Sequence, residues 1–447
     1  MHHQHKITIF LLFLSAGLGA QQELMLSSLP DLWHSNSINP AFYPEGKRFF
    51  IGVPALSLDI AHSGELTYND LFREEGDRTY IDLSQAIDKL EPENELFYQQ
   101  RIETVSLGLR SRDSLWGLQL GHAILLNAWV KYPKSLAQIL WYGNAPFVGQ
   151  TLQIGPQTDA FDWHEWSVGV SRQVGNFSLG ARLKYLTGMN LLRTDDGHTE
   201  LSVYTDPDIY QLTLRTDYQF YSSSLVESFD TSGYGYDINA GSFGGSPSTK
   251  NSGFAFDLGL HAKLSERLSV YASALNLGGA ITWKKDVSTF TSRNEYTYNG
   301  AEIAGLDIIN GSDNLDFDAQ LDTLNDIFKF VKTGSDNLKN DLPMRIYAGG
   351  SFDLSEKWSV SLNAMYETLN SRDNTAAGAG IRWEPLRWLS LGAMYSTSSR
   401  SSSNLGFHLI LQPGPVQVYL TSDNLLNGFS AKSSPAANFR VGGALVF

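Results

Sequence analysis

The feature that most limits how this chain folds is a two-residue alternation of apolar and polar side chains. Runs of about ten residues or more carry it, the length that a tilted strand needs to cross a bilayer. In 177–186, the apolar residues Phe177, Leu179, Ala181, Leu183 and Tyr185 alternate with Ser178, Gly180, Arg182 and Lys184. Similar runs occupy 103–111, 358–367 and 388–396. Because successive side chains of a strand point to opposite faces, each run predicts a strand with one apolar and one polar face.

The apolar face of these strands is expected to face lipid. A soluble sandwich also alternates, but its strands are about 5–6 residues long and its outward face is charged. Here Trp and Tyr stand on the apolar faces, where membrane proteins place interfacial aromatic girdles. A closed barrel also pairs every backbone group inside hydrocarbon. We therefore expect an all-β, transmembrane antiparallel outer-membrane β-barrel with a polar interior.

Two kinds of connection join the expected strands. Short turns occur at 112–114, 174–176, 206–208, 265–267, 355–357, 384–386 and 412–414, and long connections at roughly 62–102, 131–161, 224–251, 299–341 and 424–436. Seven short hairpins plus a first strand at 48–61 and a last at 437–447 give sixteen strands. The hairpin around Pro207 is the weakest of the seven, so fourteen stays open. Short turns are typical of the periplasmic side and long loops of the outside.

Short helices are expected within the long loops. Leu83, Ile87 and Leu90 have helical spacing, as do Leu321, Leu324, Ile327 and Phe328. A third helix is expected between Tyr132 and Tyr142. These helices either fold into the mouth of the barrel or cap it from outside.

The first twenty residues have the pattern of a secretory signal peptide. Lys6 precedes an apolar run from Ile7 to Leu14, and Gly19-Ala20 offers a cleavage site. The run is too short for a membrane anchor, which needs about 20 residues. We expect residues 1–20 to be removed near Ala20, residues 21–47 to form an N-terminal periplasmic or hatch segment, and residues 48–447 to form the barrel.

Composition excludes several classes of function. The chain has no Cys, so disulfides, thiolate metal sites and Cys nucleophiles are excluded. Its net charge of −14 argues against nucleic acid as a partner. No P-loop, zinc-type HExxH or nucleophile elbow occurs, and His198 and His261 have no partner identifiable by spacing. His164-Glu165, between Trp163 and Trp166, is interpreted as part of an interfacial girdle. We expect no enzyme, no cofactor and no metal.

Several stretches resemble known outer-membrane barrels. The Asn39-Pro40-Ala41 element resembles the N-terminal element of long-chain fatty-acid transporter (FadL-like) barrels. The chain resembles an uncharacterised Bacteroidota outer-membrane β-barrel family more closely, through 29–33, 62–64, 68–72, 274–278, 283–284 and 419–426. This resemblance implies a FadL-like barrel, often of fourteen strands, and a related branch serves type IX secretion as accessory barrels. The alternating last strand, with Phe439, Val441, Leu445 and Phe447 on one face, resembles the C-terminal signal read by the barrel-assembly machinery.

Candidate functional residues fall into two sets. If residues 21–47 enter the lumen, the Asn39-Pro40-Ala41 element anchors a plug; otherwise it is a periplasmic lead-in with a tight turn. The expected lumen face carries Arg110, Arg182, Lys184, Asp257, His261, Glu367, Arg382, His408 and Arg440. These charges form either a selectivity ring or structural ion pairs that fill the interior.

One histidine does not fit the pattern of its strand. His122 shares parity with Leu118 and Leu120 on an apolar face. It therefore either faces lipid near the interface or is turned inward by a bulge.

Two functional hypotheses follow, both in the outer membrane and in contact with its lipid. In the first, the barrel passes or binds small hydrophobic molecules, porin-like, with residues 21–47 as a hatch. In the second, it is an anchor whose long loops, 62–102 and 299–341, hold a secreted or surface protein. An open lumen favours the first, and a filled lumen with apolar loop tips favours the second.

Overall fold

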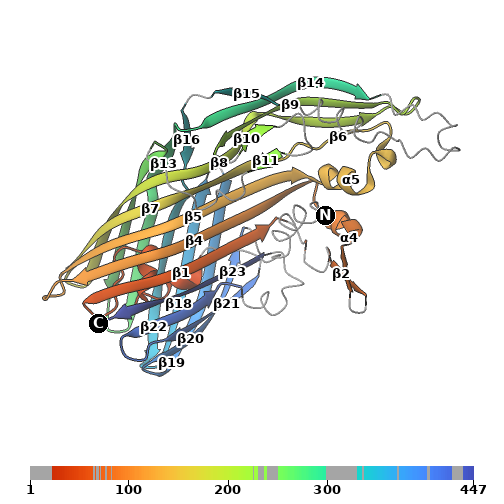
Figure 1. The fold of residues 1–447 in the computed structure, drawn as a ribbon. Helices are drawn as coiled ribbons and strands as arrows, with labels where there is room; N and C mark the ends of the chain where they lie inside the picture. The colour runs from red at the N-terminus through yellow and green to blue at the C-terminus, as the bar shows by residue number, and fades with distance from the viewer. Residues whose placement is uncertain are drawn as a thin grey trace.

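A closed antiparallel β-barrel of fourteen strands forms the body of the molecule in the computed structural model (Figure 1). The structure describes all residues except 1–22, 64–65, 67–69, 71, 76–77, 82, 225, 230–235, 239–249, 299–329, 335–336, 370–371, 400–402 and 425–435. The predicted signal peptide therefore lies outside the described residues, as does the helix predicted at 321–328. Each barrel strand pairs with its neighbours along the chain, and the last strand pairs with the first.

The barrel strands differ in length. They are β1 (Phe49–His62), β4 (Glu93–Arg110), β5 (Trp116–Pro133), β7 (Gln157–Val174), β8 (Phe177–Thr205), β12 (Ser252–Lys263), β13 (Leu268–Trp283), β17 (Met344–Ser355), β18 (Trp358–Leu369), β19 (Arg372–Leu386), β20 (Leu389–Ser398), β21 (Asn404–Leu411), β22 (Val416–Ser422) and β23 (Ala436–Val446). Short turns gather at one end, called here the short-turn end, where the chain also enters β1 and leaves β23. The opposite end is called the long-loop end.

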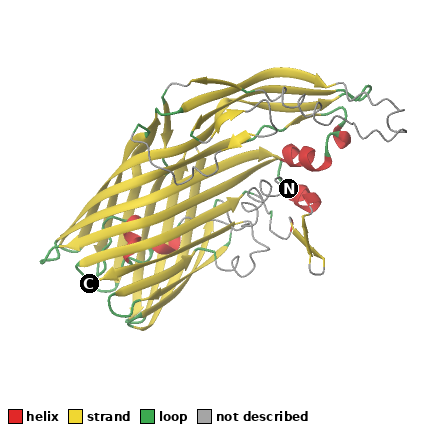
Figure 2. Ribbon diagram, in the orientation of Figure 1, coloured by secondary structure: helices red, strands yellow, loops and turns green. Residues whose placement is uncertain are grey.

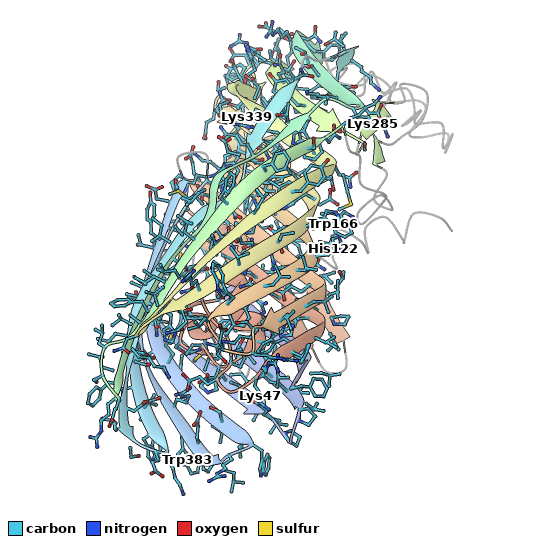
Figure 3. All side chains as sticks on the ribbon, turned by 90° about the vertical axis from the view of Figure 1, so that its left-hand side faces the viewer. Lys47, His122, Trp166, Lys285, Lys339 and Trp383 are labelled. Carbon is cyan, nitrogen blue, oxygen red and sulfur yellow. The ribbon has the colours of Figure 1, made fainter. Side chains whose placement is uncertain are left out.

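The wall confirms the predicted sidedness. On β8, Leu179 and Leu183 are 50% and 44% exposed, whereas Arg182 and Lys184, which alternate with them, are 5% and 3% exposed. A soluble protein would bury the leucines and expose the charges. The wall thus presents apolar side chains outward and encloses charged ones, as a membrane-spanning barrel requires. Trp116, Trp383 and Trp388 are exposed and lie at or beside strand ends of the short-turn end, and Trp383 is labelled in Figure 3.

The structure confirms fourteen strands, the alternative that the sequence leaves open, and the turn count of sixteen is wrong because of the Pro207 hairpin. Six of the seven predicted short turns join neighbouring barrel strands. The turn predicted at 384–386 is slightly displaced, to the gap between β19 and β20. The Pro207 turn instead joins the far end of β8 to β9 (Leu212–Ser223), beyond the barrel. Alternation continues along this pair, so periodicity alone does not separate a membrane strand from an extramembrane one.

An extension sheet projects past the long-loop end (Figure 1). The upper part of β8 pairs with β6 (Thr151–Gln153) and β9, β9 pairs with β14 (Val287–Tyr298), and β14 pairs with β15 (Val331–Gly334). β16 (Leu338–Asp341) pairs with the upper part of β13. Two small hairpins, β2 (Phe72–Glu75) with β3 (Arg78–Ile81) and β10 (Val226–Phe229) with β11 (Tyr236–Ile238), complete the strands.

Helices occur at two levels (Figure 2). At the long-loop end, α4 (Leu83–Lys89), α5 (Lys134–Tyr142) and the short 3₁₀ turn η2 (Ala145–Phe147) confirm two of the predicted loop helices. Inside the barrel lie α2 (Leu24–Ser27) and the 3₁₀ helix η1 (Trp33–Ser37). No helix in the described part of the chain is long and apolar enough to cross a membrane.

Candidate functional site

Residues 23–47 fill the lumen and are called the plug. Their apolar side chains pack against lumen-facing wall residues in one cluster. The plug members are Leu24, Met25, Leu26, Leu29, Leu32, Ile38 and Phe42, and the wall members include Tyr271, Tyr347, Met365, Met394 and Tyr419. Leu24 and Phe42 are fully buried. The plug is therefore a packed part of the barrel interior.

The Asn39-Pro40-Ala41 element lies against two glycines of neighbouring strands. Gly180 of β8 and Gly259 of β12 face each other across the sheet. A Cβ on Gly180 would lie 2.3 Å from the Pro40 carbonyl carbon, and one on Gly259 would lie 2.1 Å from Asn39 Oδ1. Because both strands lack a side chain here, the plug backbone lies directly on the wall.

Hydrogen bonds hold the same element in place. Asn39 Nδ2 donates to the backbone carbonyls of Leu260 and Ala272, at 3.1 and 3.3 Å. Its Oδ1 accepts from the Ala41 N–H at 2.9 Å, so the side chain also fixes the turn. Gln119 Nε2 donates to the Pro40 carbonyl at 2.8 Å, and Ser178 Oγ donates to the Ala41 carbonyl at 3.0 Å.

A row of side chains of alternating charge, called here the charge chain, runs along the inner face of the barrel wall. Asp257 binds Lys184 at 3.0 Å and Arg182 at 3.4 Å, and Lys184 also binds Glu165 at 3.4 Å. Arg101 joins Glu165 to Glu103 at 3.1 and 3.2 Å, and Arg440 joins Glu103, at 2.6 Å, to Glu23 of the plug. The charge chain contains four acidic and four basic side chains, so the formal charges of its members cancel. An ion-selective ring requires an excess of one sign, so this arrangement is that of structural ion pairs.

Two arginines of the charge chain bind the plug, Arg182 mainly through backbone carbonyls and Arg440 through side chains. Arg182 donates to both oxygens of Asn36, with 2.6 Å to Oδ1, and to the Ser37 carbonyl at 3.3 Å. Arg440 Nη2 donates to Ser37 Oγ at 3.2 Å. Beside them, burial lowers the pKa of His34 in the plug to about 4, against the opposing effect of Glu103, so this side chain is neutral at pH 7. The ion pairs thus fasten the plug to the wall.

Two stretches that carry the family resemblance support this site. In 274–278, Asn276 adopts a positive φ of 57° at a bulge of β13; its N–H donates to Asp257 at 2.9 Å and its Oδ1 accepts from Lys184 at 2.8 Å. In 419–426, Asp423 accepts from the Met25 N–H at 2.6 Å, and burial raises the pKa of Asp423 to about 7. Both stretches therefore position the plug or its ion pairs.

The other predicted lumen residues lie apart from the charge chain. Glu367 pairs with Arg345 at 2.7 Å. His408 is buried against Met25 Sδ and Ser390. Arg110, His261 and Arg382 line a cavity of about 490 Å³ at the short-turn end.

His122 keeps its parity and stays on the outer side of the wall. Its ring centroid lies 4.0 Å from that of Trp166, which is half exposed, and both are labelled in Figure 3. Its Nδ1 contacts Thr104 Oγ1 at 2.7 Å and its Nε2 contacts His164 Nδ1 at 2.9 Å. The bulge lies in the facing strand, at Thr104. The girdle interpretation of His164-Glu165 is wrong in part, since Glu165 joins the charge chain inside.

Cavities lie on either side of the plug. The short-turn cavity is lined by Pro30, Ala41 and Tyr43 of the plug. At the long-loop end, a cavity of about 190 Å³ is lined by Phe97, Trp129 and Leu369, with Glu95, Glu367 and Arg372 among its polar groups. Within the described part of the chain, no three His, Asp or Glu side chains are grouped to hold a metal ion.

Comparison with known proteins gives solved structures with a distant overall similarity and one family. The toluene transporter TbuX of Ralstonia pickettii has a TM-score of 0.43 and 12% identity, with 97% of this chain and all of that chain covered. The toluene transporter TodX of Pseudomonas putida has a TM-score of 0.41 and 10% identity, with 97% and 94% covered. No curated protein matches the chain. The model "Family of unknown function (DUF5723)" matches residues 40–423, from Pro40 in the plug to Asp423 beside it. The chain therefore belongs to the DUF5723 family.

Proposed function

We propose that this protein is an outer-membrane channel for small hydrophobic molecules and that residues 23–47 are its hatch. The observation that carries the proposal is the position of the plug between two cavities. Pro30, Ala41 and Tyr43 of the plug line the larger short-turn cavity, whereas wall residues such as Phe97 and Trp129 line the cavity at the long-loop end. In this proposal, movement of the plug opens a path between the two ends of the lumen.

The nature of the lumen supports a hydrophobic substrate. On the long-loop side of the charge chain, the interior holds an apolar cluster that includes Phe161, Trp163, Leu186 and Trp283. Phe97 and Trp129 add aromatic surface to the long-loop cavity. Because the charges of the charge chain cancel, the lumen offers little electrostatic selectivity for an ion, whereas aromatic surface favours an uncharged, apolar solute.

A second function, anchoring a partner protein, is favoured by another observation. The lumen is filled, and the extension sheet carries large apolar side chains at its outer end. Leu140 of α5 is 76% exposed, and Ile209 and Tyr210, at the turn between β8 and β9, are 67% and 69% exposed. Exposed apolar tips of this kind are typical of protein contact sites.

Residues 1–20 are proposed to be the export leader and the outward face of β23 the assembly signal. Phe439, Val441 and Phe447 are exposed on that face, and Leu445 is half-buried. N-terminal sequencing of the protein purified from outer membranes should begin near Gln21. A mature protein that starts at Met1 would contradict the leader.

A disulfide lock tests the hatch, because the chain has no Cys of its own. Ser178 Oγ lies 3.0 Å from the Ala41 carbonyl, so the Ala41→Cys/Ser178→Cys pair ties the plug to β8. The readout is uptake of the dye N-phenyl-1-naphthylamine by cells that express the protein. We expect the oxidised lock to lower uptake to that of cells without the protein, and reduction to restore it.

The matched control ties two wall strands without touching the plug. Ser269 and Ser351 face each other on β13 and β17, with 2.8 Å between their hydroxyl oxygens. The Ser269→Cys/Ser351→Cys pair should leave uptake unchanged whether oxidised or reduced. Unchanged uptake in the oxidised plug lock would refute the moving hatch, and wild-type uptake no higher than that of empty cells would refute the channel.

The anchor function has its own test. Crosslinking in intact cells should recover a stoichiometric protein partner with the wild type and lose it with the double variant Leu140→Ser/Ile209→Ser. Recovery of the same partner with both proteins would count against this surface.

A further inference from the structure

The first and last strands of the barrel meet at one seam. β1 pairs with β23 from Phe50 opposite Val446 to Ala61 opposite Ala436. Unlike the hairpins, this pairing joins segments from opposite ends of the chain, so it carries the largest loop-closure entropy of any strand pair. Without other help, pairing of β1 with β23 is therefore expected to be the slowest strand pairing of the wall.

Trp33 of the plug sits directly on this seam. Its ring stacks on Phe50 of β1, with 4.6 Å between centroids and 12° between planes. The same buried cluster includes Ala444 and Val446 of β23. The indole Nε1 donates to Ser106 of β4 at 2.8 Å, and the Trp33 backbone N–H donates to Gln417 Oε1 of β22 at 2.9 Å. One residue thus contacts four consecutive strands around the seam.

The wall is shaped to receive this indole. Gly108 of β4 lies opposite Phe50, and a Cβ there would lie 2.3 Å from Trp33 Cη2. Gly52 of β1 lies opposite Ser106, and a Cβ there would lie 3.2 Å from Nε1. Two neighbouring strands therefore leave out side chains where the ring lies.

Arg440 makes a second bridge over the seam. It stands on β23 opposite Ser57 of β1, yet its Nη2 binds Glu103 of β4, on the far side of β1, at 2.6 Å. Its other contacts include Glu23 and Ser37 of the plug. Between these two bridges the wall strands pack closely, since a Cβ on Gly442 of β23 would lie 2.5 Å from Ala55 Cβ of β1.

We propose that the plug has an assembly function: its Glu23–Ser37 part brings β1 and β23 together and closes the barrel, with Trp33 as the positioning residue. The rest of the plug differs in this respect. Asn39 and Ala41 contact β8, β12 and β13, of which β12 pairs with β8 and is joined to β13 by a short turn, all within the middle of the chain. Closure is independent of whether the hatch moves, so failure of the channel proposal leaves it standing.

Refolding with engineered cysteines tests this proposal. The Ile51→Cys/Leu445→Cys pair reports the seam, because these residues face each other on β1 and β23. The Ser269→Cys/Ser351→Cys pair reports a wall contact far from it. The protein is diluted from urea into detergent, and a bifunctional maleimide is added at timed intervals to measure how fast each pair becomes linked.

We expect Trp33→Ala to slow seam linkage at least tenfold and to leave linkage of the 269/351 pair at the wild-type rate. Gly108→Val, which obstructs the ring's position, should act in the same way. The matched control is Phe42→Ala, which removes an equally buried plug ring that packs on Tyr271 and His261 instead. It should leave seam linkage unchanged.

Three results would overturn the proposal. Seam linkage at the wild-type rate in both Trp33→Ala and Gly108→Val removes the positioning role. Equal slowing of both cysteine pairs by Trp33→Ala reports general destabilisation instead. Equal slowing of the seam by Phe42→Ala shows that packing of the plug as a whole matters and that the seam contact does not.

Discussion

The close approach of the plug to Gly180 gives the sharpest test of how the plug is held. Gly180→Ala introduces a Cβ that would lie 2.3, 2.4 and 2.5 Å from Pro40 C, Pro40 O and Ala41 N. All three are backbone atoms, so no side-chain rotation relieves the clash. Ordinary contact requires at least 3.4 Å, so the plug backbone has to move by about 1 Å.

That displacement has a predictable cost. It stretches the bonds from Gln119 to Pro40 O and from Ser178 to Ala41 O, now 2.8 and 3.0 Å, to about 4 Å, beyond hydrogen-bonding distance. At about 1 kcal/mol each, the two lost bonds weaken docking by about 2 kcal/mol. Since 1.4 kcal/mol is a factor of ten, the undocked fraction should rise about 30-fold.

The assay is labelling of Ala41→Cys, the single thiol in the variant chain, by a water-soluble maleimide. Ala41 is 2% exposed, so labelling reports undocking. Gly180→Ala should speed labelling about 30-fold, and Gly334→Ala, where a Cβ meets nothing within 4 Å, should leave it unchanged. Equal labelling rates of Ala41→Cys with and without Gly180→Ala would refute the reasoning.

Three further predictions concern the surroundings of the plug. Glu165→Gln removes two buried ion pairs and should destabilise the barrel by about 3 kcal/mol. The temperature at which the barrel unfolds on heat-modifiability SDS gels should fall. Asp217→Asn, on the exposed extension, should leave that temperature unchanged. Because burial raises the pKa of Asp423 from 3.8 to about 7, docking favours the protonated acid and should weaken as pH rises through that range. Labelling of Ala41→Cys relative to free cysteine should show this weakening, and Asp423→Asn should abolish it. Asn276→Ala should destabilise the barrel more than Asn276→Gly by about 1 kcal/mol in the same gel assay, since Gly tolerates a φ of 57° and Ala does not.

Local pattern predicted the wall well, because membrane strands carry their sidedness in every second residue. The alternation at 177–186 matches the lower part of β8, and the short turns at 112–114 and 265–267 match real hairpins. The number of barrel strands was harder to predict from the sequence. The hairpin at Pro207 has the same local signals as a barrel hairpin, and only its pairing partners place it in the extension.

Two members of the charge chain, Arg101 and Glu103, escaped sequence reasoning because of a single extra residue. On β4, Leu107 and Leu109 face outward, so simple parity places Arg101 and Glu103 outward as well. The bulge at Thr104 shifts the register by one, which turns both residues into the lumen. The unusual polar residue His122, opposite this bulge, was the available signal.

The plug contacts were only partly predictable. The Asn39-Pro40-Ala41 element drew attention through its sequence, but its binding site consists of Gly180 and Gly259, far away along the chain. Glycines in alternating strands have many explanations, and long-range contacts between a loop and a wall leave no periodic signal. Asp423, which accepts from Met25 N–H, and Gln417, which bonds to Trp33 N–H and the Asp31 carbonyl, were missed for the same reason.

β8 runs without a break from the short-turn end to the tip of the extension, Phe177 to Thr205. At about 3.3 Å per residue, the 21 steps from Lys184 to Thr205 span about 70 Å of continuous backbone. A force applied to the tip therefore acts on the same ribbon that carries Arg182 and Lys184. On its way to the residues that fasten the plug, such a force passes the stretch between Thr194 and Thr199, where the pairing of β8 with β9 shifts register.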